Sequence, residues 1–358
     1  MRAAVFVGTD QPLAIEDVKP APPGPQDVVV EIGASGVCHS DLSLMRGYVP
    51  LPPGMILGHE GTGRVVEVGK EVTKVKKGDR VVASFVPACG TCWFCLRDQS
   101  NHCEEETRLM MTPRGTRGDG SPYMCMTGLG TFAEAVTTSE HSVVPIRGDV
   151  PDEQLALIGC GVTTGVGAAL NTAAVQPGST VAVVGCGGVG QAVVQGARIA
   201  GAARIIAVDM VPMKREQAKK FGATDGVDPK QGDATAQVRG LTGGRGVDYA
   251  FEVIGLPETI LQAYGMARNG GTVCIVGMAR ADAMVTFPAF QLFFEEKRIL
   301  GSKYGSAHVR RDFQRFIDLI ETGRLDTTHM VSRKIKLDEV NEGFRAMEAG
   351  EVIRSVIV

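Results

Sequence analysis

The chain lacks an excess of charge of either sign: its 358 residues hold 37 Lys and Arg against 40 Asp and Glu, for a formal net charge of −3. This balance gives no reason to expect nucleic acid or an anionic membrane as a partner. The N-terminus, residues 1–7, lacks the apolar core of a secretory leader and predicts a first β-strand. Internal repeats, low-complexity tracts and long linkers are also missing. The composition is that of an ordinary α/β protein with room for two domains.

Charged residues are absent altogether from one long stretch, residues 154–197. A stretch of this length is sufficient for a membrane span. Pro177-Gly178 interrupts it, however, and Gly, Thr, Asn and Gln are scattered through both halves. A buried helix followed by a fully buried parallel strand explains the pattern better than a membrane helix does.

Cysteine is plentiful, with nine in the chain, and four of them fall within fifteen residues. Their spacing, Cys89-x2-Cys92-x2-Cys95-x7-Cys103, is typical of a closed tetrathiolate metal site. Because four thiolates leave no open position on zinc, such a site is expected to be structural. The alternative is a disulfide framework, which the missing leader makes less favourable. Thiolate chemistry in a reducing cytoplasm is therefore predicted.

The two parts of the chain have different sequence patterns. Up to about residue 150 it is rich in proline and short valine runs, and the strand-like segments 28–32, 64–68 and 80–83 indicate a mainly β domain. After residue 175, strands at 180–184, 204–208, 248–253 and 272–276 alternate with helical segments, which predicts a doubly wound parallel sheet. Helices at 308–322 and 337–349 precede a closing strand at 351–358. That strand suits the mainly β domain. The domain with the parallel sheet is therefore expected to be inserted into the β domain.

A dinucleotide fingerprint follows the first of these parallel strands. Gly185-Cys186-Gly187-Gly188-Val189-Gly190 opens a helix, and Asp209 ends the next strand 19 residues after Gly190. The glycines allow a tight turn, an approach of pyrophosphate to the backbone, and close packing of helix on strand. A carboxylate at Asp209 accepts a ribose 2′-OH and repels a 2′-phosphate, so NAD is predicted over NADP. The alternative, that the glycines serve only as a loop, lacks this context.

Three further candidate metal ligands are Cys38, His59 and Cys160, each of which alone could be an ordinary buried side chain. Their surroundings, Gly36–Asp41, Gly58–Gly63 with Gly69, and Gly159–Gly165, resemble the zinc signatures of the medium-chain alcohol dehydrogenases. The resemblance runs from end to end and includes the cysteine loop and the fingerprint. It implies a GroES-like, mainly β catalytic domain (residues 1–162 and 305–358) that carries two zinc ions. An inserted Rossmann domain that binds NAD would span residues 163–304.

The resemblance also implies roles for individual residues. Cys38, His59 and Cys160 would hold a catalytic zinc with a fourth position open to alcohol or water, and the cysteine loop would hold the structural zinc. Asp41 would fix the tautomer of His59, Glu60 would lie behind the metal, and Ser40 would take the substrate proton. The cofactor contacts would be Gly185, Gly187, Gly188, Val189, Gly190, Asp209, Lys214, His39, Arg354 and Thr164. Liver-type members end the proton relay with a histidine where this chain has Ser43, so we expect the proton to leave through water or another group.

The substrate is the least determined point. Phe85, Phe132 and Val49 are the pocket-wall candidates that the resemblance supplies, with core packing as the alternative for each. An apolar wall favours a primary or aromatic alcohol, oxidised reversibly to its aldehyde by hydride transfer to NAD+. By resemblance, the enzyme is expected to be a homodimer or homotetramer. A sheet edge such as residues 272–276, with the segment after it, is the plausible interface.

Two alternatives remain. The chain also resembles the thiol-dependent formaldehyde dehydrogenases, which oxidise a hydroxymethyl adduct of glutathione or mycothiol. The acidic anchors of that substrate would fall at Val49 and Leu51, and the basic position at Thr107, unless Arg108 replaces it. The second alternative is a non-catalytic zinc and dinucleotide-binding protein, which would hold one metal per chain instead of two.

Overall fold

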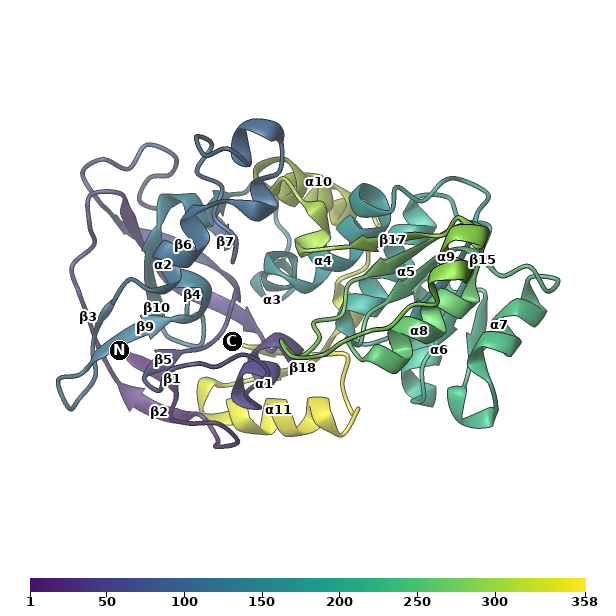
Figure 1. The fold of residues 1–358 in the computed structure, drawn as a ribbon. Helices are drawn as coiled ribbons and strands as arrows, with labels where there is room; N and C mark the ends of the chain where they lie inside the picture. Colours follow the sequence, from purple (N-terminus) through teal and green to yellow (C-terminus); the bar gives the residue numbers. More distant parts are fainter. The chain divides into compact units, whose positions relative to one another are not determined.

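The computed structural model describes all residues, 1–358, and divides into two compact units. The first contains Met1–Gly161 and Ala307–Val358, and the second contains Val162–Ser306. The second unit is thus inserted into the first, and both termini belong to the first (Figure 1). The domain bounds expected from the sequence were 1–162 with 305–358, and 163–304.

The first unit is built from two β-sheets. One has the strand order β2-β1-β5-β9-β8-β3, and the other has the order β11-β7-β6-β4-β19-β18, with β10 also paired to β4. Its strands are β1 (Arg2–Phe6), β2 (Ala14–Asp17), β3 (Lys19–Pro20), β4 (Asp27–Gly36), β5 (Met55–Ile56), β6 (Glu60–Val68), β7 (Arg80–Ala83), β8 (Gly115–Thr116), β9 (Pro122–Cys125), β10 (Ala135–Ser139), β11 (Val143–Pro145), β18 (Val331–Ile335) and β19 (Arg354–Ile357). Its helices are α1 (His39–Met45), α2 (Glu105–Met110), α3 (Asp152–Leu155), α10 (Val309–Glu321) and α11 (Val340–Glu348).

The closing strand is where the sequence predicted it. β19 pairs antiparallel with β4, with Val356 opposite Gly36, so the C-terminus completes the mainly β unit. The strands predicted at 28–32, 64–68 and 80–83 lie within β4, β6 and β7. The helix predicted at 337–349 begins with a 3-10 turn at Leu337–Glu339 before α11.

The second unit is a parallel, six-stranded sheet with the order β14-β13-β12-β15-β16-β17. Its strands are β12 (Thr180–Val184), β13 (Arg204–Val208), β14 (Asp225–Val227), β15 (Val247–Glu252), β16 (Ala267–Ile275) and β17 (Arg298–Gly301). Its helices are α4 (Gly161–Gly167), a π-helical turn at Ala168–Thr172, α5 (Gly188–Ile199), α6 (Pro212–Phe221), α7 (Ala234–Leu241), α8 (Pro257–Met266) and α9 (Ala289–Glu295). Helices alternate with strands around this sheet (Figure 1), as expected of a Rossmann fold.

One expectation about this sheet was wrong. Residues 272–276 were expected at a sheet edge, but β17 pairs with β16 and lies outside it. The sequence 298–301 is too short for periodicity to distinguish a strand from a loop, and the pairing depends on a partner more than twenty residues earlier.

The uncharged stretch 154–197 is a run of buried core elements. Residues 155–163 are buried, β12 is almost entirely buried, and most of α5 is buried as well. No single helix in the structure is long and apolar enough to cross a membrane. The consecutive helical segments 152–159 and 161–172 would reach that threshold only if they were taken together, across the bend between them.

Candidate active site and metal centres

The first cluster of metal-binding side chains comes from three separate places in the mainly β unit. Cys38 precedes α1, His59 directly precedes β6, and Cys160 follows a 3-10 turn at Ala156–Gly159. The ligand atoms of these three residues and of Glu60 all lie within 4.8 Å of one another, and all four residues are buried. Two sulfurs, an imidazole and a carboxylate in this space are a donor set that suits zinc. The residues present therefore fit a metal ion.

Asp41 organises this cluster from within α1. Its Oδ1 accepts a hydrogen bond from the Gly58 backbone N–H at 3.0 Å and lies 3.2 Å from His59 Nδ1, while its Oδ2 accepts from the Cys38 N–H at 3.3 Å. A carboxylate beside Nδ1 keeps the proton on that nitrogen and leaves Nε2 free for a metal. Burial opposes the charged form of His59, but Asp41 and then Cys38 outweigh it and raise the imidazole pKa.

The two thiols of the cluster share a hydrogen bond. This bond with Cys160 lowers the pKa of Cys38, against the effect of burial, and Arg354 and His59 act in the same direction. The cluster therefore favours a thiolate at Cys38 even before a cation is considered, and a metal ion needs its cysteine ligands deprotonated.

Only one of the two carboxylate oxygens of Glu60 has hydrogen-bond partners. Its Oε1 accepts from the Gly161 N–H at 3.1 Å and pairs with Arg354 Nη2 at 3.1 Å, whereas its buried Oε2 has no partner. Burial raises the pKa of Glu60 to about 7, although Arg354 opposes the shift. A buried carboxylate oxygen without a partner calls for a cation or proton. Glu60 is thus a fourth potential ligand of the same metal.

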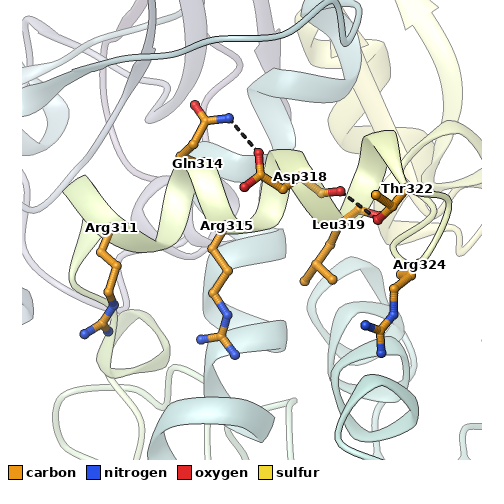
Figure 2. Close-up of a pocket in the computed structure, with 7 residues that line it drawn as sticks. All are labelled: Arg311, Gln314, Arg315, Asp318, Leu319, Thr322 and Arg324. Carbon is orange, nitrogen blue, oxygen red and sulfur yellow. Dashed lines mark hydrogen bonds between the residues drawn. The ribbon is translucent and has the colours of Figure 1, made fainter.

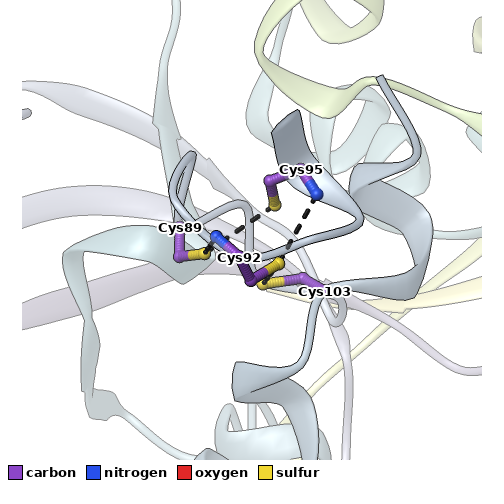
Figure 3. A group of neighbouring side chains, drawn as sticks. All are labelled: Cys89, Cys92, Cys95 and Cys103. Carbon is purple, nitrogen blue, oxygen red and sulfur yellow. Dashed lines mark hydrogen bonds between the residues drawn. The ribbon is translucent and has the colours of Figure 1, made fainter. Parts of the chain in front are cut away.

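The second cluster is the cysteine loop. The ligand atoms of Cys89, Cys92, Cys95 and Cys103 also lie within 4.8 Å of one another, and Figure 3 shows the four side chains converging. Cys89 Sγ accepts from the backbone N–H groups of Thr91 at 3.4 Å and Cys92 at 3.3 Å. Although burial opposes ionisation, these N–H groups lower the pKa of Cys89 to about 6. All nine cysteines of the chain are free thiols, so the loop offers four sulfurs to a metal instead of two disulfides.

The fingerprint in the inserted unit has the predicted strand–turn–helix form. Gly185 directly follows β12 with φ at +91°, and Gly187 caps the N-terminus of α5. A Cβ at Gly190 would lie 1.9 Å from the Gly185 carbonyl oxygen, whereas a Cβ at Gly187 would have nothing within 4 Å. Gly190 is therefore required by packing, and Gly187 keeps open the space that a pyrophosphate would approach.

Asp209 lies beside the glycine turn that follows β12. It follows β13, and its carboxylate accepts from the backbone N–H groups of Cys186 and Val211, both at 2.8 Å. These two bonds fix the carboxylate beside the glycine turn. Lys214, in the first turn of α6, is half-buried, and its carbonyl accepts from the Gln191 side chain at 2.9 Å.

Comparison with known proteins agrees with this fold and identifies its family. Residues 24–148 match the family described as alcohol dehydrogenase GroES-like domain, and residues 188–322 match the zinc-binding dehydrogenase family. Putative alcohol dehydrogenase D of Mycobacterium tuberculosis is 39% identical over 364 residues, with 99% of each chain covered. The chain belongs to the zinc-binding alcohol dehydrogenases. It is an oxidoreductase, and zinc and NAD are the cofactors of its family.

Other relatives of this dehydrogenase carry different substrates in their names. The S-(hydroxymethyl)glutathione dehydrogenase of a Synechocystis strain is 40% identical over 367 residues, covering 99% of each chain. The crystal structure of benzyl alcohol dehydrogenase from Acinetobacter calcoaceticus superposes with a TM-score of 0.92 at 30% identity, covering 99% of this chain and 98% of the other.

The pocket-wall candidates have different surroundings. The Phe85 ring meets the His59 ring edge-on, with 5.6 Å between centroids, so it lies directly against the first cluster. Val49 is 40% exposed. Phe132 is 0% exposed and packs in the core against Phe344, with ring centroids 6.1 Å apart. Of the two phenylalanines, Phe85 is the one whose contact with a cluster residue supports a role beside substrate.

The remaining predicted residues are also placed. Ser40 Oγ lies 3.8 Å from Cys38 Sγ, His39 is exposed at the start of α1, and Thr164 lies in α4. Arg354 is only 3% exposed, and besides Glu60 it donates through Nη1 to the Val37 carbonyl at 3.1 Å. Its visible contacts are therefore within the mainly β unit.

Sequence reasoning missed two cations beside the cysteine loop, Lys74 and Arg310. Lys74 is one of several lysines between residues 70 and 77, and such a run of lysines predicts a solvent-exposed surface. Arg310 is more than two hundred residues from the loop in sequence, so no local pattern connects the two.

Proposed function

We propose that this dehydrogenase oxidises a primary or aromatic alcohol to its aldehyde, reversibly, with NAD+ as the hydride acceptor. The observation that carries the proposal is the buried cluster of Cys38, His59 and Cys160 with an aromatic ring, Phe85, against the imidazole. When bound, zinc supplies a Lewis acid that withdraws charge from the alcohol oxygen, and NAD supplies the hydride acceptor. The likeness to a benzyl alcohol dehydrogenase supports the aromatic class.

The chain's own residues would prepare this chemistry. Cys38, His59 and Cys160 would hold the catalytic metal, and Asp41 would fix the imidazole so that Nε2 faces it. Ser40 is half-buried beside Cys38, which supports its role as the hydroxyl that receives the substrate proton.

Glu60 would adjust the coordination from the side opposite to its Arg354 contact. With one oxygen fixed by Arg354 and Gly161, its free Oε2 is available to the metal when no substrate is present. Arg354 is then a positioning residue for Glu60. The four sulfurs of the cysteine loop would hold the second, structural zinc.

The inserted unit would bind NAD through the turn after β12. The open space at Gly187 supports the approach of pyrophosphate to the backbone, and the carboxylate of Asp209 supports the ribose 2′-OH. We expect Lys214 to contribute a positive charge near the same ribose.

A second candidate function is supported by the relatives named S-(hydroxymethyl)glutathione dehydrogenase. Such a substrate carries carboxylates that need cationic anchors. Thr107 is exposed and uncharged, and Arg108 is already paired with Glu105 one turn earlier on α2. Val49 and Leu51 offer no charge to the ammonium group of the same substrate. The simple alcohol is therefore the better supported candidate.

A substrate panel separates the two candidates. We would follow NADH absorbance with benzyl alcohol, short primary alcohols and formaldehyde, the last with and without glutathione or mycothiol. The proposal expects the highest kcat/KM with an alcohol and no dependence on thiol. Formaldehyde oxidation that requires a thiol and exceeds every alcohol would favour the second candidate.

We propose that the protein forms a homodimer or homotetramer through the inserted unit. Met284, Phe290, Phe293 and Phe294 are all highly exposed, and the rings of Phe290 and Phe294 stack on each other at 5.8 Å between centroids. The edge strand β17 follows them, so apolar surface and unpaired backbone are close in sequence. Replacing Phe290 and Phe294 with serine is expected to yield a monomer in light scattering. A wild-type monomer would contradict the proposal.

The two thiol-rich clusters need reduced cysteines, which supports a cytoplasmic location.

A further inference from the structure

A hollow of about 230 Å³ lies beside the cysteine loop, and it is separate from the catalytic cluster. It is lined by Lys74, Ala88, Cys89, Gly90, Cys95, Ser100, His308 and Arg310. Two of the four cysteines, Cys89 and Cys95, thus line the same small space as two basic side chains, Lys74 and Arg310. The catalytic cluster uses none of these residues.

Lys74 is fixed in place by several contacts. Its Nζ donates to the Cys89 carbonyl at 3.2 Å and contacts His141 Nδ1. The backbone N–H groups of Thr73 and Lys74 both donate to Glu140 Oε2 at 2.8 Å, which anchors the loop that carries the lysine. A neutral imidazole accepts from an ammonium group, so Lys74 is the charged partner of this pair.

Arg310 reaches the same loop from the other end of the sequence. It is the second residue of α10, and its Nε and Nη2 both donate to the Ala88 carbonyl at 3.4 Å. Ser100, which lies between Cys95 and Cys103, donates to the Ala307 carbonyl at 3.4 Å. The two cations therefore hold consecutive carbonyls, Ala88 and Cys89, directly before and at the first cysteine.

A divalent ion held by four thiolates leaves the site with two negative charges. Cys89 and Cys103 are buried, so water screens this charge poorly, and burying an unpaired charge is unfavourable. Lys74 and Arg310, which hold the carbonyls at the start of the loop, oppose this excess in sign, and the buried Glu140 carboxylate near both of them offsets part of their charge. Because the cations would already be neutralised, the hollow has little attraction left for an anionic ligand.

We propose that Lys74 and Arg310 are the counter-charges of the cysteine-loop metal site, positioning residues that keep the metal bound without taking part in alcohol oxidation. The proposal rests on the assignment of zinc to the four cysteines. A purely structural tether would instead stabilise the zinc-loaded and the zinc-free protein alike.

The test removes each charge and keeps the side-chain volume. Lys74→Met and Arg310→Met are compared with Lys74→Arg and Arg310→Lys, which keep the charge. Lys77→Met and Arg315→Met are the matched controls. Lys77 is exposed three residues after Lys74. Arg315 lies on α10 and lines a different hollow of about 460 Å³ together with Arg311, Gln314, Asp318, Leu319, Thr322 and Arg324 (Figure 2).

Zinc release to a chromophoric chelator is measured on the purified, zinc-loaded enzyme. The chain has one tryptophan, Trp93, and it lies inside the cysteine loop, so its fluorescence identifies which zinc has left. We expect the Trp93-linked zinc to leave at least about tenfold faster from both methionine variants, as for other groups that act on a metal through its ligands. The charge-preserving variants and the two controls should release it at the wild-type rate.

Thermal melting separates a counter-charge from a tether. Loss of a counter-charge lowers the melting temperature of the zinc-loaded enzyme and leaves that of the chelated enzyme unchanged. Equal losses in both states, or wild-type zinc release from both methionine variants, would overturn the inference. A wild-type enzyme without a Trp93-linked zinc would instead refute the metal assignment on which it rests.

Discussion

Replacing Asp41 with asparagine tests the organisation of the catalytic cluster. The Asp41 carboxylate accepts three hydrogen bonds, from the Cys38 N–H, the Gly58 N–H and His59 Nδ1. Asparagine has one acceptor oxygen, so one side of the group turns from acceptor to donor. If the amide faces Cys38, a buried N–H loses its partner. If it faces His59, the imidazole proton moves to Nε2, the nitrogen that the metal needs.

The expected losses of folding stability and of zinc affinity follow from these two outcomes. A buried donor without a partner costs about 1–3 kcal/mol of folding stability. Groups that orient metal ligands typically change metal affinity by about 10–100-fold, or ~1.4–2.8 kcal/mol at ~1.4 kcal/mol for each factor of ten. We therefore expect Asp41→Asn to be less stable by about 1–3 kcal/mol. One of the two zincs should bind roughly 10–100-fold more weakly.

The assay is a competition titration of zinc against a chelator at neutral pH, with kcat/KM measured at low and at saturating zinc. Activity should recover partly when zinc is added. Asp248→Asn is the matched control, because Asp248 also accepts several hydrogen bonds but lies in the inserted unit. The reasoning is refuted if Asp41→Asn loses stability yet holds both zincs with wild-type affinity and turns over normally.

Three further predictions concern the cofactor turn, the proton path and pH. Gly190→Ala should abolish NAD binding and lower solubility because its Cβ would lie 1.9 Å from the Gly185 oxygen. Gly187→Ala should melt within about 2 °C of wild type but bind NAD roughly tenfold more weakly, since its Cβ meets only open space; unchanged NAD affinity would contradict the assigned approach. Ser43→Ala should leave kcat nearly unchanged, and a loss of about a hundredfold or more would place Ser43 in the proton relay. Burial opposes ionisation of Asp248, but the Thr180 N–H and Arg268 lower its pKa. Its stabilisation is therefore fully present above the unfolded carboxyl pKa and is lost as pH falls through the lower, folded-state pKa. Urea unfolding of Asp248→Asn should thus show a deficit at pH 7 that shrinks toward pH 3; a deficit independent of pH would contradict this.

Much of the fold could be predicted because its signals are local. The strands predicted at 180–184 and 204–208 each have four consecutive apolar residues after one polar residue, and they coincide with β12 and β13. The glycine turn and the acid after the second strand are similarly close in sequence. The edge position of β17 was not predictable in this way, since sheet order depends on pairing between distant segments.

The site residues also differ in how far apart they lie in the sequence. The four cysteines of the cysteine loop could be predicted as a metal site from their spacing alone, and the structure brings all four together. Cys38, His59 and Cys160 come from distant segments, and a family resemblance was needed to group them. The Arg354–Glu60 ion pair and the hydrogen bonds from Arg310 to the Ala88 carbonyl join residues hundreds of positions apart, so the folded state, not a sequence motif, produces them.

We propose that one chain carries two zinc sites, of which the one at Cys38, His59 and Cys160 performs alcohol oxidation. The most direct test counts zinc per chain by elemental analysis and follows NADH formation from benzyl alcohol in the same preparations. Wild type is expected to hold two zincs and form NADH, and Cys160→Ala to keep one zinc, remain folded and form none. A wild-type chain with a single zinc, or a Cys160→Ala variant that still oxidises the alcohol, would contradict the claim.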